Sequence, residues 1–278
     1  MLKHILAAID FSPAWPQIQA QLVRLPALGC ERVTLAYVIA QGYTQAPELS
    51  HDEHYKGQLA EIAKAVAAST GMAVDWTMRT RSVAPELIAA AEAIGADTIL
   101  AGSQVHSPIR ELVLGSTVHN LARLVDRPLL LAPVDGTDAQ SLATTCRPLL
   151  ATDGSPAATG AEAAFLEILP CCGRGVVVSV GRWDRDPDTD DTRATIAAHI
   201  DRLAKRATPN TFDVELIGDG KPSRVIKGVA AAYEANLVIV GRRGHNPLTE
   251  LLLGSTAEAL CRESDQLVLL VPAATAHA

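Results

Sequence analysis

Short apolar runs alternate with longer stretches of mixed polar and apolar residues along the whole chain. In the first half, the apolar runs predict strands at 4–9, 32–38, 73–80, 98–101 and 129–132. The mixed stretches between them have helical spacing and predict helices at 14–28, 53–70, 84–94 and 116–125. Ser12 is the expected N-cap of the first helix, with Pro13 at its first position.

The second half repeats this order. Strands are predicted at 148–152, 176–180, 212–217, 237–240 and 267–271, and helices at 157–169, 190–206, 223–235 and 255–263. Strands that alternate with helices and lack a polar face are typical of parallel sheets covered on both sides. The predicted fold class is therefore α/β, with two tandem copies of a five-stranded, Rossmann-like parallel-sheet sandwich.

An internal repeat supports the two copies. Residues 102–117 and 241–256 are identical at nine of 16 positions, at an offset of 139. Near the start of each half, residues 10–13 (DFSP) match 153–156 (DGSP) at an offset of 143. Turn-forming residues follow Val134. We therefore predict an N-terminal domain at 1–138 and a C-terminal domain at 145–278.

Composition and charge exclude several classes of protein. The net charge is −7, with −4 in residues 1–140 and −3 in 141–278. The sequence has no stripe of basic residues, so nucleic-acid binding is not expected. The five cysteines are odd in number and lack a C-x-x-C spacing, which argues against a disulfide framework or zinc site. No apolar run approaches the ~20 residues of a membrane span, and no signal peptide is evident. A cytoplasmic protein without a membrane partner is expected.

A glycine-rich segment follows the predicted strand 237–240. It contains Gly241, Gly244 and, after nine further residues, Gly254, with Ser255 and Thr256 opening a helix. Glycines let the backbone approach a ligand closely, and free N–H groups at a helix N-terminus suit an anion. The segment predicts a phosphate cradle, although it lacks the G-K-[ST] ending of a Walker A loop. The alternative, that these are turn residues with Ser255 as an ordinary N-cap, is less favoured because the spacing occurs twice.

This pattern, G-x2-G-x9-G-[ST] after a fourth strand together with Asp153 in an A-T-D-G-S context, resembles the universal stress protein family in both halves. The resemblance implies a stress-response regulatory protein that binds ATP, or ADP or AMP, with Mg²⁺ accompanying the nucleotide and with little or no turnover. The alternatives are a protein-interaction scaffold without nucleotide, a slow ATPase, and an enzyme of the wider adenine-nucleotide α-hydrolase-like group. No further catalytic motif is visible, so we assign no catalytic residue.

The resemblance also implies roles for single residues. The aspartates after the first strands, Asp153 and Asp10, would contact the adenine end, and Val180 and Val38 would lie against the base. The glycine motif would hold the ribose and phosphates. In the C-terminal copy these residues are Gly241, Gly244, Gly254, Ser255 and Thr256, with Arg242 and His245 as additional candidates. Arg242 and Arg243 either neutralise phosphate charge or point to solvent.

The N-terminal copy departs from the motif. Gly102, Gly115, Ser116 and Thr117 are present, but Val105 stands where the middle glycine is expected. A β-branched side chain resists positive φ and would crowd a phosphate. We expect this copy to bind nucleotide weakly, to bind something smaller, or to bind nothing.

Partners are less well defined. The two copies are expected to pack as an intramolecular pseudo-dimer through their fifth strands, 129–132 and 267–271, because an apolar sheet edge needs cover. A homodimer of the chain and the identity of a protein partner stay open. The histidine-containing segment 51–54 (HDEH) is interpreted as a solvated loop rather than a metal site.

Overall fold

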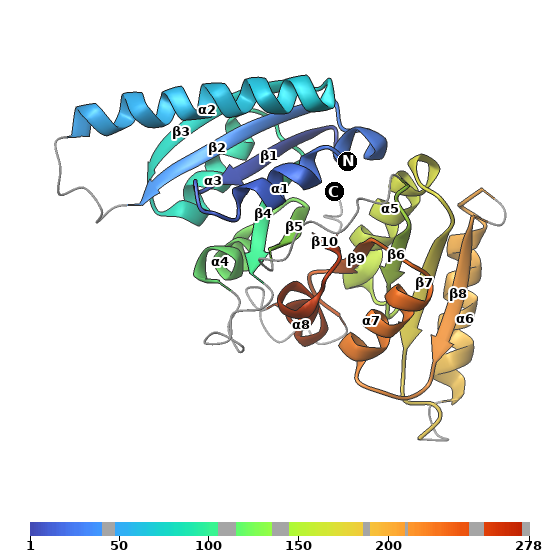
Figure 1. Cartoon of the computed structure of the whole chain (residues 1–278). Coiled ribbons are helices and arrows are strands. Elements are labelled where there is room, and N and C mark those ends of the chain that lie inside the picture. The colour runs from blue at the N-terminus through green and yellow to red at the C-terminus, as the bar shows by residue number, and fades with distance from the viewer. Residues whose placement is uncertain are drawn as a thin grey trace. The chain divides into compact units, whose positions relative to one another are not determined.

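The computed structural model describes residues 1–40, 48–104, 115–134, 145–185, 190–208, 211–244 and 253–273. The chain forms two compact units, Met1–Leu142 and Ala143–Ala278 (Figure 1). The segment predicted to join the domains falls largely within 135–144, outside the described residues.

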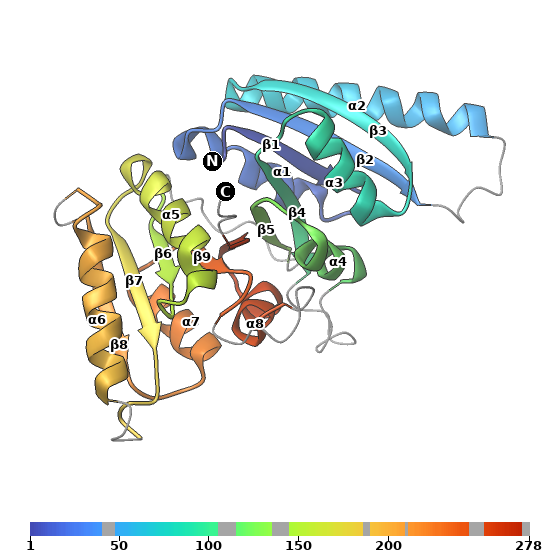
Figure 2. The ribbon, with the colours of Figure 1, turned by 180° about the vertical axis from the view of Figure 1, so that it is seen from behind.

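The N-terminal unit is built on a parallel sheet with the strand order β3-β2-β1-β4-β5. The helices α1 and α2 cover one face, and α3 and α4 cover the other (Figures 1 and 2). The strands are β1 His4–Ile9, β2 Arg32–Ala40, β3 Ala73–Arg81, β4 Thr98–Gln104 and β5 Leu129–Val134. The helices are α1 Trp15–Leu22, α2 Glu48–Thr70, α3 Val83–Ala93 and α4 Ser116–Leu124.

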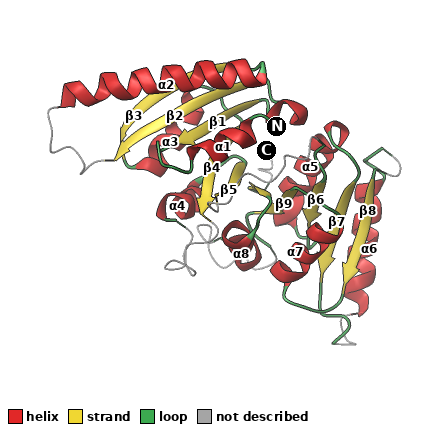
Figure 3. Ribbon diagram, in the orientation of Figure 1, coloured by secondary structure: helices red, strands yellow, loops and turns green. Residues whose placement is uncertain are grey.

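The C-terminal unit has the equivalent parallel order, β10-β9-β6-β7-β8. The helices α5 and α6 lie on one face, with α7 and α8 on the other (Figure 3). The strands are β6 Pro148–Ala151, β7 Gly175–Val180, β8 Phe212–Ile217, β9 Leu237–Gly241 and β10 Leu267–Val271. The helices are α5 Thr159–Ile168, α6 Asp190–Ala204, α7 Pro222–Ala232 and α8 Ser255–Glu263.

Burial explains the continuous apolar runs. Every residue of β6 and β9 is buried, as is all of β7 except its last residue, Val180. Strands covered on both faces have no solvent side to carry alternating polar residues. The predicted fold class, two five-stranded parallel α/β units, is confirmed.

The first helix is shorter than predicted. The single helix expected at 14–28 is α1 Trp15–Leu22 followed by a 3₁₀ turn, η1 Leu25–Leu28. Pro26 has no N–H for the helical ladder and its ring disfavours a helical residue before it, so the α-helix ends earlier. Ser12 is not the N-cap: its hydroxyl accepts from the Ala14 N–H at 3.3 Å within a turn, and Ala14 precedes the helix.

The same effect divides the helix predicted at 157–169. Short 3₁₀ turns, η2 Pro156–Ala158 and η3 Leu169–Cys171, flank α5, and each contains a proline in its first turn. In the N-terminal unit, α2 begins at Glu48, five residues before the predicted start. The segment 51–54, expected to be a loop, is therefore helical.

The described residues bear on two further expectations. None of their helices combines the length and apolar character that a bilayer-spanning segment needs. The five cysteines are all free thiols, with Cys30, Cys146 and Cys261 buried, Cys172 half-buried and Cys171 exposed.

Phe165 anchors the α5 side of the C-terminal core. Its side chain is fully buried and meets the Phe212 ring edge to face, with centroids 5.6 Å apart. We predict that Phe165→Ala lowers the free energy of unfolding by about 3–5 kcal/mol, because it removes buried contacts and leaves a cavity. Urea unfolding followed by circular dichroism measures this. Val214→Ala, on a side chain 45% exposed, is the control and should change stability by no more than ~0.5 kcal/mol. Equal effects of the two variants would contradict the assignment.

Candidate functional site

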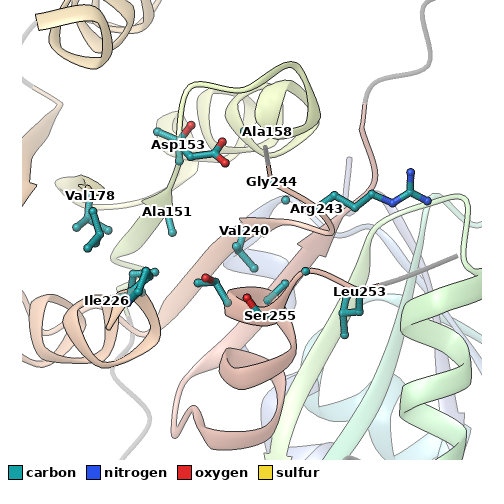
Figure 4. Close-up of a pocket in the computed structure, with 17 residues that line it drawn as sticks. Ala151, Asp153, Ala158, Val178, Ile226, Val240, Arg243, Gly244, Leu253 and Ser255 are labelled. Carbon is teal, nitrogen blue, oxygen red and sulfur yellow. The ribbon is translucent and has the colours of Figure 1, made fainter. Parts of the chain in front are cut away.

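A pocket of about 540 Å³ opens in the C-terminal unit at the carboxyl ends of β6, β7 and β9 (Figure 4). Strand order reverses at β6, since β7 pairs on one side and β9 on the other. Crevices at such switch points are the usual ligand sites of open α/β sheets. The lining residues are Ala151, Thr152, Asp153, Ala158, Val178, Val180, Pro222, Ile226, Val240, Gly241, Arg243, Gly244, Leu253, Gly254, Ser255, Thr256 and Ala257.

One wall of the pocket is apolar. The strands β6, β7 and β9 contribute Ala151, Val178 and Val240, and α7 contributes Ile226. Val180, predicted from the sequence to lie against a base, is part of this lining. The wall offers a flat or aromatic ligand a surface from which water is displaced.

Asp153 lies at the rim, two residues after the end of β6. Its Oδ1 accepts a hydrogen bond from the Ser155 N–H at 3.0 Å, which forms a tight turn. Gly154 within this turn has a φ of +68°, a conformation that side chains other than glycine rarely adopt. The turn fixes the aspartate at the edge of the pocket, across from Ser255 (Figure 4).

The glycine segment is held in place by its own backbone. The Arg242 N–H donates to the Val271 carbonyl at 2.8 Å, and the Gly254 N–H donates to the Arg242 carbonyl at 3.0 Å. These bonds join the end of β9 to β10 and to the start of α8. Both ends of the glycine segment therefore lie beside the pocket.

Lack of space explains two of the glycines. A Cβ on Gly241 would lie 3.0 Å from the Arg243 carbonyl oxygen and 3.2 Å from the Ala157 carbonyl oxygen. A Cβ on Gly244 would lie 2.7 Å from Oδ2 of Asp153. All three distances are shorter than ordinary van der Waals contacts. A side chain at Gly241 would press on backbone, and one at Gly244 would displace the Asp153 carboxylate.

The reason for the middle glycine differs from the one predicted from the sequence. That glycine was expected to need positive φ, but Gly244 is not among the residues with positive φ. The constraint at this position is the close approach of Asp153. Val105, the equivalent residue of the N-terminal copy, lies outside the described residues.

The N-terminus of α8 closes the other side of the pocket. Gly254, with φ −64° and ψ 141°, is the N-cap, and Ser255 and Thr256 are the first two helical residues. The interpretation of Ser255 as the N-cap is therefore wrong. The first N–H groups of a helix have no partner within it and carry the positive end of the dipole. Cys261, on the same helix, is buried, and burial raises the pKa of its thiol to about 12.

The two neighbouring arginines differ in position. Arg243 lines the pocket, whereas Arg242 is not among the lining residues. The Nε of Arg243 is buried and has no hydrogen-bond partner within the part of the chain that the structure describes. Figure 4 shows the Arg243 side chain extending away from Asp153 and Ile226. His245, also a predicted site residue, lies outside the described residues.

The N-terminal copy has the same backbone features. Ser12 N–H donates to Asp10 Oδ1 at 3.0 Å, matching the Asp153 turn. Val38 is buried near the end of β2, and Gly115 is the N-cap of α4, whose first residues are Ser116 and Thr117.

The side chains around this turn are larger in the N-terminal copy. The match of residues 10–13 to 153–156 puts Trp15 at the position of Ala158, which lines the C-terminal pocket. Trp15 is 7% exposed. A Cβ on Gly102 would lie 2.7 Å from Cδ1 of Ile18, so this helix packs directly against the first glycine. This Trp-for-Ala difference is present in the sequence repeat, and the prediction based on Val105 alone missed it.

Both halves of the chain match one known protein family. The sequence model described as the universal stress protein family matches residues 1–133 and again residues 147–272. The chain belongs to the universal stress protein family. The resemblance inferred from the glycine motif and Asp153 is thus confirmed, and both copies are family domains.

Individual relatives agree with this assignment. A universal stress protein from Mycolicibacterium smegmatis is 26% identical over 289 residues, covering 95% of this chain and 93% of that protein. A universal stress protein structure from Archaeoglobus fulgidus has a TM-score of 0.78 at 20% identity and covers 99% of this chain and 100% of its own. A functionally unknown Pseudomonas aeruginosa protein has a TM-score of 0.66 at 18% identity, covering 98% and 93%. The structural matches establish a shared fold.

Proposed function

We propose that this universal stress protein is a stress-response regulator whose C-terminal domain binds one adenine nucleotide, with ATP as the preferred form. The observation that carries the proposal is a single cavity that combines an apolar wall, an aspartate and a helix N-terminus. Seven predicted site residues line it: Asp153, Val180, Gly241, Gly244, Gly254, Ser255 and Thr256. Its volume of about 540 Å³ is within the usual ~300–1,000 Å³ range for small-molecule sites.

The base would lie on the apolar side. Val178, Val180 and Ile226 would contact its faces, and the Asp153 carboxylate at the rim would accept a hydrogen bond from the exocyclic amino group. An ionised carboxylate accepts hydrogen bonds and cannot donate them, so it suits the amino group of adenine, which is a donor. This pairing supports an adenine nucleotide over an anion alone.

The phosphates would lie at the N-terminus of α8. The N–H groups of its first turn and the hydroxyls of Ser255 and Thr256 are suitable donors, and Arg243 adds a positive charge. Mg²⁺ would accompany the phosphates, because it favours phosphate oxygens and water as ligands. The tightness around Gly241 and Gly244 supports a site in which backbone, rather than side chains, approaches the ligand.

Turnover is not part of the proposed function. We assign binding residues and no catalytic residue, and any slow hydrolysis would act as a switch between bound states. A nucleotide-free interaction scaffold is the competing function, and the first prediction below separates the two.

We predict that the purified full chain carries or binds close to one ATP or AMP, measured by mass spectrometry of released ligand and by calorimetric titration. Gly244→Val should abolish binding, because a side chain there would displace the Asp153 carboxylate from the rim of the pocket. Two nucleotides per chain would contradict the proposed asymmetry of the copies. No binding at millimolar ATP would instead favour the scaffold.

The arginines provide a matched pair. Arg243→Met should weaken ATP binding roughly tenfold, about 1.4 kcal/mol, and leave adenosine binding unchanged, because the lost contact is with phosphate. Arg242→Met removes the same charge one residue away, outside the lining, and should have a smaller effect. Calorimetry with both ligands measures this. Equal losses in the two variants would mean that long-range charge, not contact, is responsible.

The Trp-for-Ala difference between the two copies can be introduced into the C-terminal domain. Ala158→Trp should fill the C-terminal pocket as Trp15 fills the equivalent position, and should weaken ATP binding more than roughly tenfold. Ala163→Trp, at an exposed position of α5, is the control and should bind like wild type. Thermal unfolding checks that both variants fold. ATP binding by a folded Ala158→Trp protein at wild-type affinity would refute the assigned pocket.

A further inference from the structure

A chain of hydrogen bonds runs from the Asp153 turn into the interior of the C-terminal domain. The Gly154 N–H donates to Thr152 Oγ1 at 3.1 Å, and Thr152 Oγ1 donates to Glu162 Oε1 at 2.6 Å. His199 Nε2 lies 2.8 Å from the same Glu162 oxygen. The chain thus joins the pocket rim to α5 and α6.

The donors and acceptors give this chain of hydrogen bonds one direction. A backbone N–H can only donate, so the Thr152 hydroxyl accepts from Gly154 and gives its own proton to Glu162. Oε1 of Glu162 accepts this bond, and His199 Nε2 donates to the same oxygen in the tautomer or charge state that carries the Nε2 proton. Thr152 itself lines the pocket, so the chain begins at the proposed nucleotide site.

Burial makes the arrangement costly unless it is satisfied. The Glu162 side chain is 4% exposed and that of His199 is 23% exposed. A buried carboxylate is tolerated only when hydrogen bonds or charges compensate for lost hydration. A buried network of this kind resists movement, because breaking one of its bonds leaves a buried polar group unpaired.

The N-terminal copy shows that the turn does not need this chain. Ile9 and Gln19 stand at the positions of Thr152 and Glu162, and Ile9 is 4% exposed. Even so, Asp10 makes the same 3.0 Å turn bond as Asp153. The chain is therefore an addition to the C-terminal copy and not a requirement for forming the turn.

We propose that Thr152, Glu162 and His199 are positioning residues that orient the Asp153 carboxylate and thereby set the base preference of the pocket. The proposal rests on nucleotide binding by the C-terminal domain. Two bonds hold this turn: the Gly154 N–H donates to Thr152 Oγ1, and the Ser155 N–H donates to Asp153 Oδ1. Loss of the hydrogen-bond chain removes the first of them, which gives the aspartate more freedom to turn. An aspartate that can turn no longer distinguishes an amino group from a carbonyl oxygen at the same place on the base.

The test compares ATP with inosine triphosphate, which has a carbonyl oxygen where adenine has the amino group. Calorimetry on the full chain gives the ratio of the two dissociation constants. Wild type should prefer ATP. Thr152→Val and Glu162→Gln should each reduce this preference roughly tenfold, mainly by weakening ATP binding. Thr152→Ser keeps the hydroxyl and should restore the preference.

Glu167→Gln is the matched control, since Glu167 is an exposed glutamate on the same helix. It should keep the wild-type preference. In ligand-free protein, the Gly154 amide should exchange its hydrogen faster in Thr152→Val than in wild type, as measured by NMR. Thermal unfolding checks each variant, and if Glu162→Gln fails to fold, the Thr152→Val and Thr152→Ser pair decides the outcome.

An unchanged ratio of the ATP and inosine triphosphate dissociation constants in folded Thr152→Val would overturn the proposal, even if both nucleotides bind more weakly. The hydrogen-bond chain would then have a purely structural role. Wild type that binds both nucleotides equally would overturn it as well, while leaving nucleotide binding intact. Wild type that binds neither would overturn the proposed function and this assignment together.

Discussion

The C-terminal pocket depends on the parallel hydrogen bonding of β6 to β7 on one side and to β9 on the other. Because the strands are parallel, their carboxyl ends reach the same edge of the sheet. The chain leaves β6 toward α5 on one face and reaches α8 from β9 on the opposite face, so the two connections separate and leave a crevice. The Asp153 turn and the glycine segment therefore face one cavity, although they are almost 90 residues apart in sequence.

Close packing at this edge determines what kind of ligand contact is available. A side chain at Gly241 would press on the Ala157 and Arg243 carbonyl oxygens, and one at Gly244 would displace the Asp153 carboxylate. Backbone N–H groups and the α8 dipole must then provide most of the attraction for an anion. Arg243 adds charge from the pocket lining, where its Nε is already removed from water.

The two domains share a backbone design and differ in what fills it. In the N-terminal domain, Trp15 and Ile9 put apolar bulk around the aspartate turn, which adds buried apolar surface. In the C-terminal domain, Ala158 leaves space for the pocket, and Thr152 with Glu162 forms a polar chain beside it. The two copies thus differ at equivalent positions around the aspartate turn: one has buried apolar side chains, and the other has a cavity beside buried polar groups that hydrogen bonds make tolerable.

Local sequence patterns were sufficient for the order of strands and helices, the duplication, the family and the glycine spacing, because periodicity and turn residues act over a few neighbouring positions. They failed where a proline acted inside an otherwise helical stretch, as at Pro26, and where α2 extended through 51–54. Only the tertiary structure decided that Arg243 rather than Arg242 lines the pocket, that Asp153 lies against Gly244, and that His199 reaches Glu162 across 37 residues. These contacts depend on how side-chain volumes from separate elements fill one space, and spacing along a single chain contains no record of that packing.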